Sequence, residues 1–206
     1  ERRAFTPEEF KLFQDNLKNL TEPQARTIGL LMCYCGAQNN EIEGLERNDV
    51  KLNTELPYIF IRNNRHRIMG KGRSDRIIPL VGRINQHLRS YIENHWDGED
   101  LLFPRLKNVS WGAQALSDAL SSCVENLRAE EDVILSPYSV RDTFTARYEA
   151  AGIEQRFGEY LMGHKSPQQS TTHEKYYKQP KAVAELAPIM RRITMVQSWG
   201  WVEEFD

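Results

Sequence analysis

The amino-acid sequence predicts a mainly α-helical domain that carries one small antiparallel β-sheet, an α+β fold. Apolar residues recur at helical spacing through most of the chain, for example at Ile28, Leu31 and Met32. Over residues 56–80 the pattern changes to short β-branched and aromatic runs separated by turn residues. The chain has 206 residues, 40% of them hydrophobic, which is enough to bury one sizeable core. We therefore expect a single domain over residues 1–206.

Capping signals mark the first two helices. Thr6-Pro7-Glu8-Glu9 combines a capping hydroxyl, a proline at the first helical position and a carboxylate at the third, which predicts a helix running towards Leu20. Thr21-Glu22-Pro23-Gln24 repeats this arrangement, and the helix that follows is expected to stop near Gly36. A short helix is expected next, over residues 41–45.

Three short antiparallel strands are then expected, over residues 58–61, 67–69 and 76–80. The segments between them contain Asn63-Asn64 and Gly70-Lys71-Gly72, which are typical turn residues. Helical spacing returns afterwards, and Ser136-Pro137 resembles a further cap. These signals predict helices over residues 84–92, 115–127, 137–152, 153–161, 170–177 and 182–194. Residues 180–206 are expected to form a tail that packs either on the chain's own core or in trans on a neighbouring protomer.

Composition excludes several classes of protein. There is no run of eighteen apolar residues, and the first twenty residues are charged and amphipathic, so neither a membrane span nor a secretory signal is predicted. Cys33, Cys35 and Cys123 lack metal-ligand spacing, which favours free thiols in a reducing compartment. We expect a cytoplasmic protein with no cofactor, no metal and no membrane partner. Because the chain begins at Glu1 rather than Met, we expect a fragment or a processed product.

Positive charge is concentrated in one segment of a chain whose net charge is −2. Between residues 62 and 76 the one acidic residue is Asp75. The basic residues of this segment are Arg62, Arg65, Arg67, Lys71, Arg73 and Arg76. Such asymmetry is typical of a surface that binds phosphates, although a run of charge is also typical of a solvated face. The first interpretation predicts that the arginines of this segment, together with Lys165, contact DNA.

Four stretches of the chain contain the residue types that DNA strand cleavage without a metal requires. These are a nucleophile, cations that hold the phosphate oxygens, and an acid for the departing oxygen. The stretches are Leu30–Ile42 with Gly44-Leu45 and Asn48-Asp49-Val50, then Gly70–Leu80, then Ser136–Phe144 with Ala151-Gly152, and last Leu161–Ser166 with Thr171–Tyr177. In their order and spacing they resemble the boxes of the tyrosine recombinase (phage integrase) family. The resemblance covers nearly the whole chain.

This resemblance implies the integrase catalytic-domain fold and a set of site residues. Tyr176 would be the nucleophile, because the first of two paired tyrosines usually serves in such relatives. Tyr177 is the alternative, because Tyr176 and Tyr177 lie twelve and thirteen residues after His164, both farther than is usual in the family, so the distance does not decide between them. Lys71 would be the general acid, Arg141 the second clamp arginine, and His164 a hydrogen-bond partner of the phosphate.

Two catalytic positions depart from the family pattern. Tyr138 replaces a histidine, and it can donate a hydrogen bond but cannot accept a proton at neutral pH. Gln38 replaces the first clamp arginine, and loss of one preorganised donor typically costs about 10²- to 10³-fold in rate. Three explanations stay open. Another cation such as Arg73 or Lys165 reaches the phosphate, or the protein binds DNA without cutting it, or Gln38 is an introduced change.

The function implied by the resemblance is site-specific DNA recombination by a tyrosine-type DNA strand transferase. Such an enzyme cleaves and rejoins DNA through a 3′-phosphotyrosine link, for example in the integration or excision of a phage or other mobile element. The expected partners are double-stranded DNA and further copies of the chain, forming a dimer or tetramer on DNA in the bacterial nucleoid. Relatives of this family carry an N-terminal DNA-clamping domain, which we expect to be absent from this chain. The alternatives are a catalytically inactive, sequence-specific DNA-binding relative, a type IB topoisomerase, and a helical scaffold unrelated to DNA.

Overall fold

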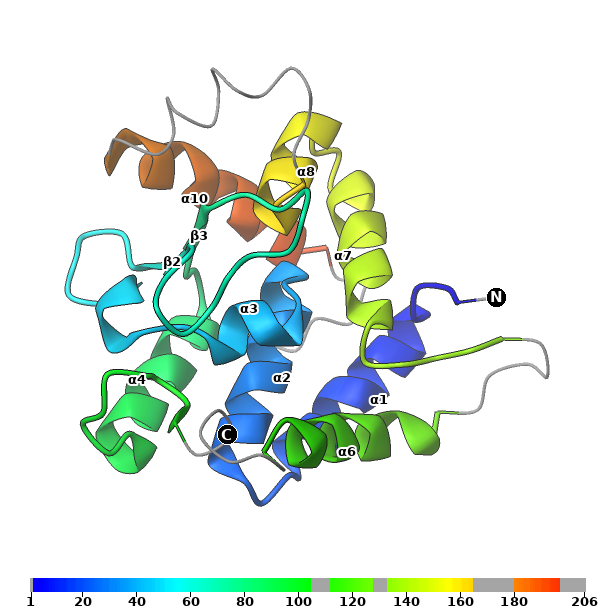
Figure 1. Ribbon diagram of the computed structural model, residues 1–206. Helices are drawn as coiled ribbons and strands as arrows, with labels where there is room; N and C mark the ends of the chain where they lie inside the picture. Colours follow the sequence, from blue (N-terminus) through cyan, green and yellow to red (C-terminus); the bar gives the residue numbers. More distant parts are fainter. Residues whose placement is uncertain (1, 105–111, 128–132, 165–179, 197–206) are drawn as a thin grey trace.

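The computed structural model describes residues 2–104, 112–127, 133–164 and 180–196 (Figure 1). Helix α2 (Pro23–Cys35) lies at the centre, with α1, α3, α4, α6 and α7 packed around it. Every residue from 27 to 35 is buried, which is typical of a helix enclosed on all sides. The helix ends where predicted, at Gly36, whose φ of 65° is the left-handed conformation common at helix C-termini. Phe144 of α7 (Ser139–Ala150) packs directly against Gly36.

The remaining helices follow the predicted order. They are α1 (Pro7–Lys18), α3 (Asn39–Glu43), η1 (Arg47–Asp49, a 3-10 helix), α4 (Arg83–His95), α6 (Gly112–Glu125), α8 (Gln155–Met162) and α10 (Pro180–Thr194). The capping box of α1 is present, since the Thr6 hydroxyl accepts from the Glu9 amide and the Glu9 carboxylate accepts from the Thr6 amide. The helix expected over 170–177 lies outside the described residues.

The sheet is antiparallel and three-stranded, but its strands differ from the prediction. Its order is β1 (Val50–Lys51), β2 (Tyr58–Ile61) and β3 (Arg76–Pro79), with Ile59 opposite Ile78. The strand predicted over 67–69 is wrong, and β1, only two residues long, was missed.

The lost strand has a physical reason. Asn64 and Arg67 exchange backbone hydrogen bonds of 3.0 and 3.3 Å, which closes a tight turn instead of extending a ladder. The Arg67 side chain then turns inward and donates to the carbonyl oxygens of Glu41 and Arg62. Buried arginine, rather than strand pairing, therefore fixes this segment.

Helix α10 covers the sheet. It packs on β3 and also touches α7, while α8 packs on the same strand (Figure 1). Its inward face is apolar, with Leu186, Met190 and Ile193 fully buried. Residues 180–194 therefore pack on the chain's own core, and trans packing of the segment beyond them stays a prediction. None of the helices in the described ranges is long and apolar enough to cross a membrane.

Candidate active site

Segments far apart in the sequence meet beside the C-terminal end of α8. The backbone of Arg73, from the turn before β3, forms a bridge with His164, which follows α8. Ser74 strengthens this junction by donating its amide to the Gly163 carbonyl at 3.1 Å. Arg141 of α7 reaches the same place, with Nη2 lying 2.9 Å from His164 Nε2. We call Arg73, Arg76, Arg141 and His164, together with the Glu41 carboxylate that pairs with the first two, the cationic cluster.

Arg141 is held by the protein on two sides. Its side chain is buried, and Nη1 donates to the Gly36 carbonyl at 2.7 Å, at the end of α2. Burial lowers the pKa of Arg141 to about 10, and the neighbouring charges of Arg73 and Arg76 act in the same direction. Arg141 nonetheless stays protonated at neutral pH. It is therefore a fixed cation in a cluster that carries several positive charges.

Glu41 of α3 is the anion at the centre of the cluster. Its Oε1 accepts from Arg73 Nε and Nη2, at 3.0 and 2.7 Å, and from Arg76 Nη1 at 3.1 Å. Its Oε2 accepts from Arg76 Nη2 and from the backbone amide of Gln38, at 2.7 and 2.9 Å. Burial alone would raise the pKa of Glu41, but Arg76 and Arg73 outweigh it and hold the pKa at about 2. The Glu41 carboxylate therefore forms ion pairs with two guanidinium groups.

His164 lies at the exposed rim of the cluster. Its amide donates to the Glu159 carbonyl at 2.9 Å, which fixes the start of the segment after α8. Loss of hydration lowers the pKa of the imidazole, and the charges of Arg141 and Arg73 lower it further, which favours the neutral ring. Since Arg141 can only donate, Nε2 of His164 must accept, and the proton then sits on Nδ1. His164 thus keeps one N–H for another acceptor.

Gly163 allows the close approach of β3 and α8. Its φ is +74°, and an added Cβ would lie 2.4 Å from Arg76 Nη1. The buried Arg76 cannot retreat, because its Nε donates to the Leu161 carbonyl at 2.7 Å and its other nitrogens bond Glu41. Only glycine therefore satisfies both the backbone conformation and the packing at this position.

Gly163→Ala is accordingly expected to lower the free energy of unfolding by about 2 kcal/mol or more, measured by urea denaturation. The positive φ alone costs about 1–2 kcal/mol for an L-residue, and the contact with Arg76 adds to it. Gly98→Ala is the matched control, because Gly98 has a φ of +87° and no described atom within 4 Å of an added Cβ. Equal losses for the two variants would show that the contact with Arg76 contributes nothing.

Other predicted site residues lie around the cluster or outside the described residues. Gln38, partly buried, occupies the N-cap position of α3, and its backbone amide donates to the Glu41 carboxylate. Tyr138, 43% exposed, caps α7 and is close enough to Arg73 to influence its pKa. Lys71 is exposed in the turn that precedes Arg73. The nucleophile candidates Tyr176 and Tyr177, and also Lys165, are not among the described residues.

The arginines of the basic segment 62–76 fall into two groups, one buried and one at least partly exposed. Arg67 and Arg76 are buried and bond protein groups, a structural role that the sequence pattern had not indicated. Arg62 pairs with Asp49 and Glu46, and the exposed Arg65 pairs with Asp100. DNA contacts by Arg62 and Arg65 stay predictions, with both side chains at least partly exposed.

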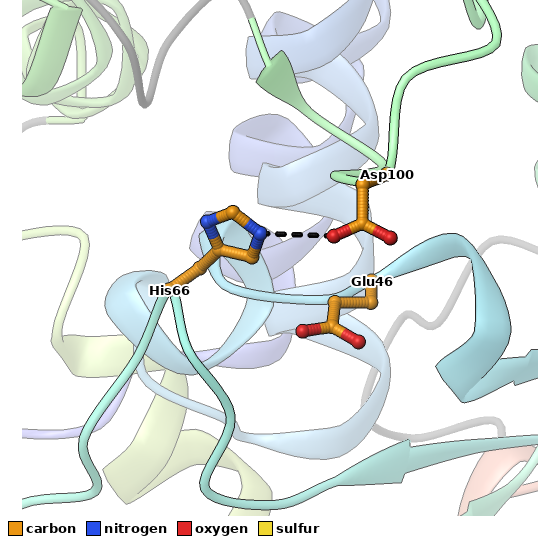
Figure 2. A group of neighbouring side chains, drawn as sticks. All are labelled: Glu46, His66 and Asp100. Carbon is orange, nitrogen blue, oxygen red and sulfur yellow. Dashed lines mark hydrogen bonds and ion pairs between the residues drawn. The ribbon is translucent and has the colours of Figure 1, made fainter.

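A second group of titratable side chains includes a histidine of the basic segment. Figure 2 shows Glu46, His66 and Asp100, whose ligand atoms lie within 4.8 Å of one another. His66 Nε2 is 3.0 Å from Asp100 Oδ2, and the two carboxylates also pair with Arg62 and Arg65. Hydrogen bonds from Arg65 and His66 lower the pKa of Asp100. Since both carboxylates already face cations, this group is better described as a surface charge network than as an open metal site.

Solved structures with the same fold belong to site-specific recombinases and integrases. XerA recombinase gives a TM-score of 0.59 at 17% identity, covering 92% of this chain and 65% of that one. The complex of XerH with palindromic difH substrate gives 0.58 at 18% identity, covering 89% and 52%. A lambda integrase dimer bound to a COC′ core site gives 0.59 at 16% identity, covering 84% and 47%. The predicted catalytic-domain fold is therefore confirmed.

Sequence comparison defines the family. The phage integrase family model matches residues 3–182, so the chain belongs to the phage integrase family. It is 25% identical over 167 residues to tyrosine recombinase XerA of Thermococcus kodakarensis, covering 79% of this chain and 54% of that protein. It is 27% identical over 146 residues to tyrosine recombinase XerD of Corynebacterium glutamicum, covering 68% and 44%. The chain thus spans about half the length of the curated relatives it matches.

Proposed function

We propose that the protein is a site-specific DNA recombinase that cuts and rejoins DNA through a 3′-phosphotyrosine intermediate. The observation that carries the proposal is the cationic cluster. Three guanidinium groups and an imidazole come together from three separate segments, and a single carboxylate pairs with two of the guanidinium groups. The positive charge that remains suits a phosphodiester, on which negative charge builds as the phosphorus is attacked.

In the proposed reaction the phenol oxygen of Tyr176 attacks the scissile phosphorus, and the bond from phosphorus to the 5′ oxygen breaks. The phenol releases its proton to solvent, while the departing 5′ oxygen receives one from the Lys71 ammonium, which becomes a neutral amine. A phosphodiester is exchanged for a phosphotyrosine ester on the 3′ side, so the bond energy is retained and no ATP is required. Rejoining is the reverse reaction, with a 5′ hydroxyl as the nucleophile. Arg141 and His164 would hold the non-bridging oxygens throughout.

The partners follow from the same proposal. Duplex DNA is the substrate, and two or four copies of the protein would assemble on it. The lambda integrase structure is a dimer on its core site, and the Tn1549 transposon integrase, with a TM-score of 0.54 at 19% identity, is bound to transposon right end DNA. By this analogy the protein would integrate or excise a phage or another mobile element within bacterial DNA.

Covalent capture tests the proposal. The chain is incubated with a library of nicked duplexes of randomised core sequence, and DNA that stays attached after denaturation is recovered and sequenced. We expect a covalent product that Tyr176→Phe abolishes and Tyr177→Phe preserves, because only the first removes the nucleophilic oxygen. The reverse pattern would make Tyr177 the nucleophile. The absence of product with the unaltered protein, despite salt-dependent DNA binding, would contradict recombination.

Gln38 favours a second candidate, a relative that binds DNA without cutting it. A neutral amide stands where the family has a clamp arginine, and the cluster could hold a phosphate without catalysis. Relaxation of a supercoiled plasmid would point instead to a type IB topoisomerase. The same capture experiment, with a plasmid included, separates these outcomes.

A further inference from the structure

We propose that Arg73 supplies the cation that the first clamp position lacks, and that it contacts a non-bridging oxygen of the scissile phosphate. The inference rests on the proposed function, since it names a further catalytic residue for that reaction. Its starting point is Gln38, whose side chain offers no charge and whose backbone amide donates to the Glu41 carboxylate at 2.9 Å. The missing charge has to come from another element if the phosphate is to be held by two guanidinium groups.

The backbone fixes Arg73 at the cluster. Its amide donates to the Gly70 carbonyl at 3.0 Å, which closes the turn that carries Lys71. On the other side, Arg73 bridges to the backbone of His164, and the next residue bonds Gly163. The turn with the proposed general acid and the segment with the phosphate-binding histidine are therefore joined at Arg73.

Only two of the three guanidinium nitrogens of Arg73 donate hydrogen bonds to described residues of the protein. Its Nε and Nη2 both donate to the same oxygen of Glu41. Its Nη1 has no hydrogen-bond acceptor within the described ranges, and the side chain keeps 9% of its surface exposed. Arg76 differs, because its Nε, Nη1 and Nη2 all donate to protein acceptors and none of its side chain is exposed. Of these two arginines, Arg73 is the one that can meet a ligand.

Charge balance points the same way. Glu41 has one negative charge to set against Arg73 and Arg76, and Arg141 bonds only carbonyl oxygens and the neutral His164 among the described residues. The charge of Arg73 is close enough to lower the pKa of Arg141. A phosphate placed between them would relieve this repulsion and could accept from Nη1 of Arg73. Arg73 and Arg141 would then form the pair of cations that the reaction requires.

The experiment compares four proteins, namely the unaltered chain, Arg73→Gln, Gln38→Arg and the double variant. Single-turnover cleavage is measured on a nicked duplex selected by covalent capture, whose scissile position has been mapped. We expect Arg73→Gln to cleave about 10²- to 10³-fold more slowly, as for loss of one preorganised donor. Gln38→Arg should have little effect alone, but it should restore much of the lost rate in the double variant. Arg156→Gln, on the surface of α8, is the control for loss of a positive charge.

A second substrate separates catalysis from structure. A methylphosphonate at the scissile position lacks one charged non-bridging oxygen, so it needs less positive charge in the transition state. The deficit of Arg73→Gln should therefore shrink on this substrate, whereas a folding defect would affect both substrates equally. Thermal unfolding is followed for each protein, and Arg73→Lys, which keeps a charge for Glu41, covers the case in which the glutamine variant does not fold. The lysine variant should show an intermediate loss, because an ammonium lacks the planar fork.

The outcomes distinguish the two proposals. Two results would overturn the role of Arg73 and leave the proposed function intact. The first is normal cleavage by Arg73→Gln. The second is a loss of rate that is equal on both substrates and that Gln38→Arg does not restore. Failure of the unaltered chain to form a covalent product on either substrate would overturn the proposed function, and the role of Arg73 with it.

Discussion

Arg141→Ala is expected to lower single-turnover cleavage by about 10³-fold or more, the upper end of the effect of one preorganised donor, because a charge is lost as well. The guanidinium is fixed by the Gly36 carbonyl and His164 before any substrate arrives. Such preorganisation means that no reorganisation is needed as negative charge builds on the phosphate. The measurement is the rate of covalent-product formation on a nicked duplex, at saturating protein.

Arg141→Lys is the informative companion variant. Lysine keeps the positive charge, but it lacks the planar guanidinium that contacts the Gly36 carbonyl and His164 at the same time. We therefore expect Arg141→Lys to cleave faster than Arg141→Ala but more slowly than the unaltered protein. Cleavage at the unaltered rate would show that charge alone matters at this position. Thermal unfolding should change less for either variant than for removal of Glu41, because Arg141 has no carboxylate partner among the described residues and is repelled by Arg73.

Glu41→Gln is expected to have the largest effect on stability, a loss of about 3–5 kcal/mol in the free energy of unfolding, as for breaking a buried ion pair. The substitution leaves the wholly buried Arg76 and the largely buried Arg73 facing each other without a counter-charge. Urea denaturation at neutral pH measures the loss. Glu154→Gln is the matched control, because the Glu154 pair with Arg156 is largely exposed and should contribute less than about 1 kcal/mol.

The pH dependence gives an independent check on Glu41. Its pKa is about 2 in the folded protein, against an ordinary value of 4.5. The folded state therefore binds this proton less readily than the unfolded state, and the stabilisation is complete above pH 4.5 and is lost as the pH falls towards 2. The unaltered protein should lose stability over this interval more steeply than Glu41→Gln. Parallel profiles for the two proteins would mean that Glu41 does not titrate as proposed.

Local signals in the sequence were sufficient for most of the fold. The Thr6 cap and the left-handed Gly36 are decided by neighbouring residues, so α1 and the end of α2 could be predicted. The segment around Arg67 could not, because its backbone follows a buried side chain that bonds residues distant in the sequence. A run of charge does not show which of its members face inward.

In the candidate site, too, some features could be predicted from local motifs and others depended on contacts between distant residues. Arg141 and His164 were expected from their motifs, and in the structure Arg141 Nη2 lies 2.9 Å from His164 Nε2. The pairing of Glu41 with Arg76 spans 35 residues of sequence, and no periodicity or cap indicates it. The glutamate stood in a motif, but its partners depended on how β3 approaches α3. Sequence reasoning therefore found the residue types of the site and missed the network that supports them.

Helix α7 ties the site to the interior of the protein. Arg141 reaches the Gly36 carbonyl, while Phe144, one turn later, is wedged against the same glycine in the core. Arg141, the proposed clamp arginine, therefore stands on a helix whose next turn is close-packed in the core, which limits how far its backbone can shift. Under the proposed function, a DNA site whose scissile phosphate is misaligned would have to bend or twist to reach Arg141.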